Sequence, residues 1–128
     1  PPVMPGDWSP ASGYAAGKRL AADPAVTAIF ASNDAMALGA MRALHEAGRD
    51  VPGSVSVVGF DDMGLSADFR APLATVHQYF DRVATAAVGM LIDRIEHQKR
   101  TTADPVPTEL IVRASTAPPP GSGTARVG

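Results

Sequence analysis

Short apolar runs alternate along this chain with longer segments in which apolar residues recur every three or four positions. Residues 26–31 and 55–60 are nearly continuous apolar runs, which predict buried strands, and residues 75–79 predict a further short strand. Residues 10–22 and 35–47 have helical spacing. This order predicts right-handed βαβ crossovers and an α/β fold, with a parallel sheet flanked by helices.

Capping and turn residues mark the ends of these helices. Ser9 is a candidate N-cap, with Pro10 at the first helical position, where its missing N–H costs nothing. Asn33 and Asp34 both belong to the preferred N-cap residues, so we expect one of them to cap the second helix. Gly48 ends that helix.

The second half of the chain has the strongest helical periodicity, in residues 80–98. Before it, the apolar residues of segment 65–73 recur every four positions and permit a short helical turn, and after it residues 108–113 predict a final strand. The end of the chain is too rich in Pro and Gly to fold. We therefore expect one folded part, residues 1–118, and a disordered tail, residues 119–128.

Composition indicates a globular protein with enough apolar material for a core. The 128 residues are 45% hydrophobic and 19% charged, with a formal net charge of −2 and no cysteine. Without a basic patch, the chain has no nucleic-acid-binding surface of its own. No apolar run approaches the roughly 18 residues of a membrane span, and no signal peptide is visible.

Polar side chains follow the predicted strands at their carboxyl ends, where ligands bind in open α/β sheets. Asn33 follows the first strand, Asp61 the second, and Gln78 lies near the end of the third. We expect the aromatic side chains of Trp8 and Phe80 to lie beside these polar residues. Amide and carboxylate hydrogen bonds together with aromatic faces suit a small polar ligand such as a sugar.

Catalytic and metal-binding patterns are absent from the sequence. There is no G-x-S-x-G, P-loop, H-E-x-x-H or G-x-G-x-x-G pattern in the required context. Asp61 and Asp62 are adjacent, so in an extended segment their side chains diverge and cannot share a proton. His77 has no ligand or triad partner at a suitable spacing and is expected to be a hydrogen-bonded strand residue. We expect no enzyme activity, no cofactor and no metal.

Longer stretches resemble the effector-binding region of the lactose/galactose-repressor (LacI/GalR) family. The resemblance runs from about Gly6 to Pro118, with the motifs in family order. The matching stretches are IFASNDAMALGAMRALHEAG at residues 29–48, VPGSVSVVGFDD at 51–62, PLATVHQ at 72–78 and PTELIVRAST at 107–116. Gly6-Asp7-Trp8-Ser9 is similar to sugar-responsive members of the family.

This resemblance implies a periplasmic-binding-protein-like fold of two Rossmann-like subdomains, of which this chain is mainly the C-terminal one. It implies that Asn33 and Asp61 hydrogen-bond the effector and that Trp8 stacks on it. Gln78 and Phe80 would approach from the edge of the neighbouring subdomain. Because only one subdomain is present, we expect weaker effector binding than in an intact regulator.

The function implied is effector binding and dimerisation within a cytoplasmic, DNA-binding transcriptional regulator. DNA would be bound only through an N-terminal helix-turn-helix that this chain lacks, and no membrane is involved. A sugar-binding receptor of a transport system is the alternative, because it shares the fold. Those receptors usually have Asp-Gly where this chain has Asp61-Asp62, and Asp62 is expected to play a supporting part.

The resemblance also raises the question of what covers residues 80–98. In the family this helix packs on the N-terminal subdomain, so here we expect it to fold back on its own sheet or to be buried by another chain. Dimerisation through the C-terminal subdomain would use residues 35–47 and 65–73. Within them, Met36 and Leu44 suit the core of the domain, whereas Leu65 and Phe69 suit an interface. A dimer is the largest assembly expected.

Overall fold

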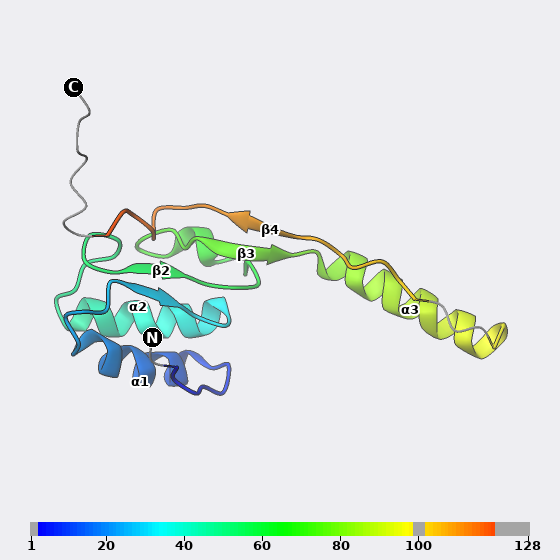
Figure 1. Ribbon diagram of the computed structural model, residues 1–128, viewed down its shortest axis with the longest axis horizontal. Coiled ribbons are helices and arrows are strands. Elements are labelled where there is room, and N and C mark those ends of the chain that lie inside the picture. The colour runs from blue at the N-terminus through cyan, green and yellow to red at the C-terminus, as the bar shows by residue number, and fades with distance from the viewer. Residues whose placement is uncertain (1–2, 99–101, 120–128) are drawn as a thin grey trace, which may run out of the picture.

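The computed structural model describes residues 3–98 and 102–119, and it has the predicted order of elements (Figure 1). Helices and strands alternate as expected, although the strands are shorter than the apolar runs. The elements are the helices α1 (Pro10–Ala21), α2 (Asp34–Glu46) and α3 (Phe80–Glu96), the 3-10 helix η1 (Ser66–Asp68), and the strands β1 (Ala28–Phe30), β2 (Ser56–Val58), β3 (Thr75–Gln78) and β4 (Thr108–Ile111). All of the predicted tail after Pro119 lies outside the described residues.

The strands lie side by side in the order β1, β2, β3, β4. β1 and β2 are parallel, with Ile29 opposite Val57. The chain after β2 continues this arrangement, because parallel bridges join Val58 to Ala74 and Asp61 to His77. β4 runs antiparallel to β3, a direction that the expected parallel sheet did not include. It does so because the chain returns directly alongside α3 instead of crossing over the sheet (Figure 1).

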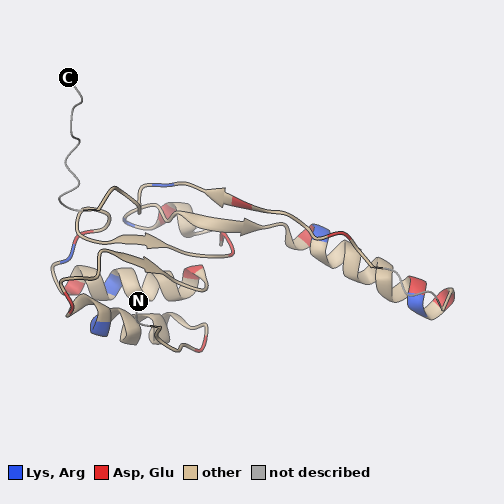
Figure 2. Ribbon diagram, in the orientation of Figure 1, with Lys and Arg blue, Asp and Glu red and all other residues tan. Residues whose placement is uncertain are grey.

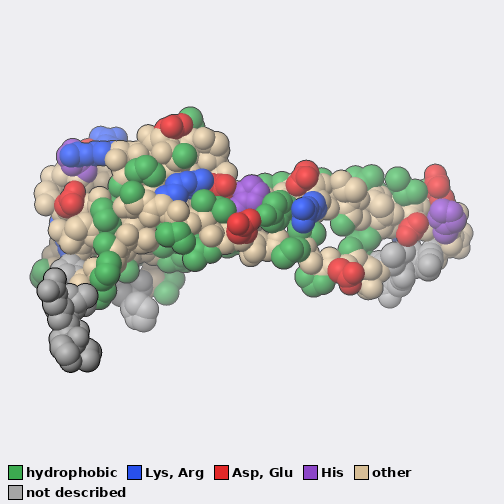
Figure 3. Space-filling model, turned by 90° about the horizontal axis from the view of Figure 1, so that it is seen from above, with side chains coloured by type: hydrophobic (Ala, Val, Ile, Leu, Met, Phe, Trp, Pro, Cys, Tyr) green, Lys and Arg blue, Asp and Glu red, His purple; other side chains and the backbone are tan. Residues whose placement is uncertain are grey.

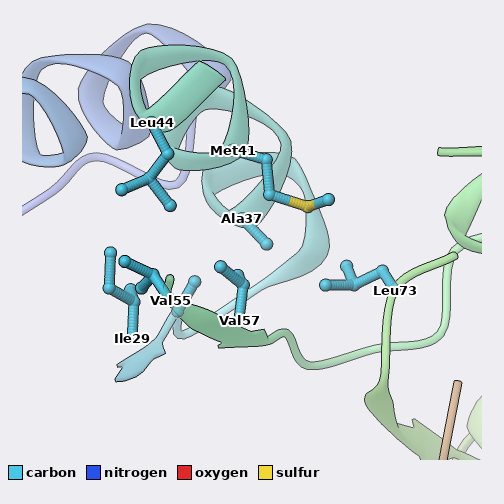
Figure 4. Packing of buried hydrophobic residues seen from close by; sticks show 8 residues of the cluster. Ile29, Ala37, Met41, Leu44, Val55, Val57 and Leu73 are labelled. Carbon is cyan, nitrogen blue, oxygen red and sulfur yellow. The ribbon is translucent and has the colours of Figure 1, made fainter. Parts of the chain in front are cut away.

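α2 covers one face of this sheet and forms the hydrophobic core with it. Ala37 and Leu44 of α2 point toward Val55, Val57 and Leu73, and all five are fully buried (Figure 4). Leu44 is therefore a core residue, as its sequence position predicts. Met36, the other expected core residue, is partly buried and packs against the same cluster.

α1 packs on α2 at glycine positions that allow the two backbones to approach closely. A Cβ atom on Gly39 of α2 would lie 1.9 Å from the carbonyl oxygen of Pro10, and one on Gly13 of α1 would lie 2.1 Å from that of Met36. Both distances are far below van der Waals contact. The N-terminus of α1 follows the prediction, because the Ser9 side chain accepts a hydrogen bond from the Ser12 N–H.

α3 extends away from the rest of the molecule and buries none of its residues (Figure 1). Only Tyr79 separates the end of β3 from the start of α3. The expectation that this helix folds back on its own sheet is therefore wrong. α3 instead continues roughly along the line of β3 (Figure 1).

Candidate ligand-binding site

Asp61 and Gln78 come together where β2 and β3 end. The Gln78 Nε2 atom donates a hydrogen bond of 2.8 Å to Asp61 Oδ1, and the Asp61 N–H donates to the Val76 carbonyl at 2.9 Å. Asp61 has a φ of 103° and Asp62 a φ of 55°, so the segment is not extended as the sequence suggested. Aspartate tolerates positive φ better than most residues. The two carboxylates nevertheless bind different partners.

Asn33 lies at the end of β1 and caps α2, as one of the two expected capping residues. Its Oδ1 atom accepts a hydrogen bond of 2.8 Å from the Met36 N–H. Its Nδ2 atom donates to the Trp8 carbonyl at 3.0 Å. This contact holds the segment before α1 against the start of α2, while 65% of the Trp8 surface stays exposed. Two predicted site residues, far apart in the sequence, are thereby placed together.

Asp34 follows Asn33, and its hydrogen bonds beside the candidate site were not predicted from the sequence. It is fully buried, and its Oδ2 atom accepts hydrogen bonds from the Met63 N–H at 2.8 Å and the Ser66 hydroxyl at 2.5 Å. Its Oδ1 atom accepts from the Thr75 hydroxyl at 2.6 Å. Asp34 thus ties the start of α2 to η1 and β3. No local pattern signals this role, since Ser66 and Thr75 lie 32 and 41 residues away.

Backbone contacts connect Asp34 to the same sheet edge as the predicted site. The Asp34 N–H donates to the Phe60 carbonyl at 2.9 Å, which fixes the start of α2 beside the residue preceding Asp61. A Cβ atom on Gly59 would lie 2.2 Å from Asp34 Oδ1, so glycine is required for this close approach. This backbone hydrogen bond joins the residue that follows Asn33 to the residue that precedes Asp61.

Asp62, for which a supporting part is expected, makes its contacts within the domain. Its Oδ1 atom accepts a hydrogen bond of 2.7 Å from Arg113 Nη2, and its Oδ2 atom lies 3.0 Å from His77 Nδ1. Burial alone would raise the pKa of the Asp62 carboxyl, but the hydrogen bonds with Arg113 and His77 and the charge of Arg113 outweigh it and hold that pKa below its usual value. His77 is a hydrogen-bonded strand residue, as predicted.

Phe80 is the predicted site residue that the structure leaves apart. It begins α3 and is 55% exposed, and within the described residues its ring contacts no other aromatic ring. The site therefore consists of two joined pairs, Trp8 with Asn33 and Asp61 with Gln78. In the described part of the chain, Asp61 Oδ2 has no hydrogen-bond partner and can accept one from a ligand.

The chemistry available at this edge is hydrogen bonding. Across residues 3–98 and 102–119, no three His, Asp or Glu residues lie close enough to hold a metal ion. None of the helices in the same residues combines the length and apolar character needed to cross a membrane. Carboxylate and amide groups at an open sheet edge can orient a small polar molecule.

Comparison with known proteins places these features in a family. Residues 2–116 match the model of the periplasmic binding protein-like domain. Among similar proteins, an HTH-type transcriptional regulator in the aml 5′ region of Streptomyces limosus is 46% identical over 111 residues, which are 86% of this chain and 31% of the relative. The HTH-type transcriptional repressor PurR of Haemophilus influenzae (strain PittEE) is 40% identical over 119 residues, 88% of this chain and 35% of the repressor.

Solved structures with the same fold are LacI-family regulators. A regulator from Enterococcus faecium with bound ribose has a TM-score of 0.79 and 31% identity, over 90% of this chain and 43% of that one. The Lac repressor dimer bound to operator and the anti-inducer ONPF has a TM-score of 0.79 and 37% identity, over 87% of this chain and 39% of that one. The chain thus spans about a third of the length of the curated relatives, 31% and 35% of the two named here.

Proposed function

We propose that the sheet edge of this chain binds a sugar effector. The premise is that the chain belongs to the periplasmic binding protein-like domain family and corresponds to the effector-binding domain of LacI-family regulators. The observation that carries the proposal is the position of Asn33, Asp61 and Gln78 at the carboxyl ends of adjacent strands, where Gln78 donates a hydrogen bond to Asp61. Trp8 is tied to this cluster through Asn33.

Each residue has a role that follows from its contacts. Asp61 Oδ2 accepts a hydrogen bond from a sugar hydroxyl, and a charged acceptor makes such a bond roughly twice as strong as a neutral one. Gln78 fixes the Asp61 carboxylate through its 2.8 Å hydrogen bond. Asn33 and the exposed indole of Trp8 supply a polar and an apolar contact on the α2 side. Phe80 adds an aromatic face once a ligand or a second subdomain closes over the edge.

The wider role we propose is that of the regulators to which the chain is similar. Residues 1–118 form one subdomain of a two-subdomain effector domain in a cytoplasmic transcriptional regulator. Operator DNA is bound by a helix-turn-helix in the part of such proteins that this chain does not match. The α2–η1 side of the domain pairs with a second copy. Since the edge has one wall, sugar binding by this chain alone is weaker than by an intact regulator.

Thermal shift measurements test the effector class. Ribose, other pentoses and hexoses, and the purine bases adenine and guanine are added separately, because the relatives include a ribose-bound regulator and PurR. A ligand that binds only the native state at about 100 times its Kd stabilises it by roughly 2.7 kcal/mol. We expect a sugar to raise the melting temperature and the purine bases to leave it unchanged.

Variants assign the response to the proposed residues. Asp61→Asn is expected to abolish most of the sugar-induced shift, whereas Asp68→Asn, an exposed residue of η1, leaves it intact. A shift with a purine base and none with any sugar would show that the effector class is wrong. An equal shift in the Asp61→Asn variant would show that the ligand binds elsewhere.

A further inference from the structure

A histidine and an arginine lie in direct contact on the α2–η1 side of the domain. His45 belongs to the last turn of α2, and Arg70 lies shortly after η1. The Nη1 atom of Arg70 lies 2.8 Å from His45 Nδ1 and 2.9 Å from His45 Nε2. In the described part of the chain, Arg70 forms no ion pair with a carboxylate. Figure 3 shows a histidine beside Lys or Arg side chains at the end of the body that lies away from α3.

This contact requires a neutral imidazole. A guanidinium group only donates hydrogen bonds, so the ring nitrogen that bonds to Arg70 has to accept. An imidazole has an accepting nitrogen only in its neutral form, because both nitrogens of the protonated ring carry a hydrogen. Protonation of His45 therefore removes the hydrogen bond and leaves two cations in contact. Histidine is the side chain whose charge ordinarily changes close to neutral pH.

The other charged groups around this pair do not balance its positive charge. Arg42 and Glu46 of α2 form an ion pair at 2.8 Å. Arg49 and Asp50, in the loop after α2, line the same surface hollow as the histidine and arginine of the pair (Figure 2). Three arginines, counting that of the pair, therefore stand against two carboxylates. The group carries one net positive charge while the histidine is neutral and two when it is protonated.

We propose that protonation of His45 controls the pairing of two copies through the α2–η1 side, which occurs while the imidazole is neutral and is lost when it is protonated. This inference rests on the pairing proposed above for that side. His45 and Arg70 line the same hollow as the apolar side chains of Leu38, Met41 and Phe69, so a second copy that covers these side chains also covers the histidine. A two-fold axis brings the same patch of both copies together, so each added charge is added twice. Like charges juxtaposed across an interface disfavour association, and the loss of water strengthens their repulsion.

The direction of the pH dependence follows from the linkage between proton binding and pairing. Because the protonated form pairs less well, a dimer that dissociates takes up protons, and dissociation increases as the pH falls. Sedimentation equilibrium of the whole chain at constant ionic strength measures the dimer dissociation constant at about pH 7.5 and about pH 5.5, on either side of the ordinary titration of histidine. We expect the constant to be at least about tenfold larger at the lower pH, since one histidine from each copy contributes.

Two histidine variants assign the pH dependence to one side chain. His45→Gln keeps a hydrogen-bond acceptor for Arg70 but cannot be charged, so we expect it to pair equally well at both pH values. His97→Gln is the control, because it makes the same change in an exposed histidine at the end of α3, and it should keep the full pH dependence.

The outcomes separate this inference from the pairing on which it rests. A dimer whose dissociation constant is the same at both pH values would overturn the control by protonation and leave the pairing standing. A chain that is monomeric at both pH values would overturn both. An unchanged pH dependence in His45→Gln would overturn the assignment to His45.

Discussion

Asp34 shows how one side chain can determine the geometry around a candidate site without touching a ligand. Its two carboxylate oxygens accept three hydrogen bonds, from Met63, Ser66 and Thr75, and its own N–H donates to Phe60. These donors belong to η1, the loop before it and β3. Asn33 precedes Asp34 in the chain and Asp61 follows Phe60, so we expect the separation of Asn33 and Asp61 to depend on Asp34 remaining an acceptor on both oxygens.

Replacing Asp34 by asparagine tests this dependence. A carboxamide has one acceptor oxygen, so at least one buried donor of the three would face an NH₂ group and lose its partner. We expect Asp34→Asn to lower the free energy of unfolding by about 3 kcal/mol, the size of a lost hydrogen bond to a charged group together with an unsatisfied donor. Urea denaturation followed by circular dichroism measures the change.

The matched control is Asp68→Asn, which makes the same chemical change on an exposed side chain of η1. Surface substitutions of this kind alter stability by less than about 0.5 kcal/mol. Equal stability of the two variants would show that the Asp34 hydrogen bonds contribute no net free energy. The comparison is informative because both residues lie close together and differ mainly in burial.

At the scale of elements, α1 and α2 depend on glycines where they meet. Gly13 and Gly17 of α1 and Gly39 of α2 are all buried, and a Cβ atom on any of them would clash with backbone atoms of the other helix. Gly89 of α3 is different, because a Cβ atom there would meet nothing within 4 Å. The same substitution should therefore have opposite effects at Gly39 and Gly89.

Gly39→Ala is expected to destabilise the domain by about 1–3 kcal/mol, the usual cost of overpacking a close contact. Gly89→Ala is expected to stabilise α3 by about 1 kcal/mol, because alanine has the higher helix propensity. Thermal unfolding measures the first effect, and the helical signal at 222 nm measures the second. If Gly39→Ala left the melting temperature unchanged, the close packing of α1 on α2 would be disproved.

Element order and type could be predicted from the sequence because they depend on local patterns. The 3.6-residue periodicity of α2 and α3 and the caps at Ser9 and Asn33 are examples. Contacts over long sequence distances could not be predicted, such as those of Asp34 with Ser66 and Thr75. The direction of α3 was also missed, because it depends on the one-residue connection after β3.

The candidate site shows the same division between local and long-range information. The places of Asn33, Asp61 and Gln78 at strand ends follow from the strand pattern, and the structure joins Asp61 to Gln78 as expected of neighbours at one sheet edge. The bond between Asn33 and the Trp8 carbonyl has no local signal. All five residues, Trp8, Asn33, Asp61, Gln78 and Phe80, remain predictions as ligand contacts.

At the scale of the whole molecule, the domain has a surface suited to self-association, on the side of α2 and η1. A hollow of about 400 Å³ lies there, lined by the apolar side chains of Leu38, Met41 and Phe69 and by the cations Arg42 and Arg70. Leu38 is 43% exposed, and Leu65, which directly precedes η1, is 64% exposed. Phe69 is half-buried, and it both packs against the core and lines the hollow.

Pairing through this side is expected to make the chain a dimer, and light scattering measures its mass. Leu38→Lys should convert the dimer to a monomer, because it places a further cation beside Arg42 and Arg70 at the centre of the contact, and juxtaposed like charges cost several kcal/mol. Arg19→Glu, at an exposed residue of α1 away from the hollow, should leave the dimer intact. If the unsubstituted chain is already a monomer, the α2–η1 side does not pair.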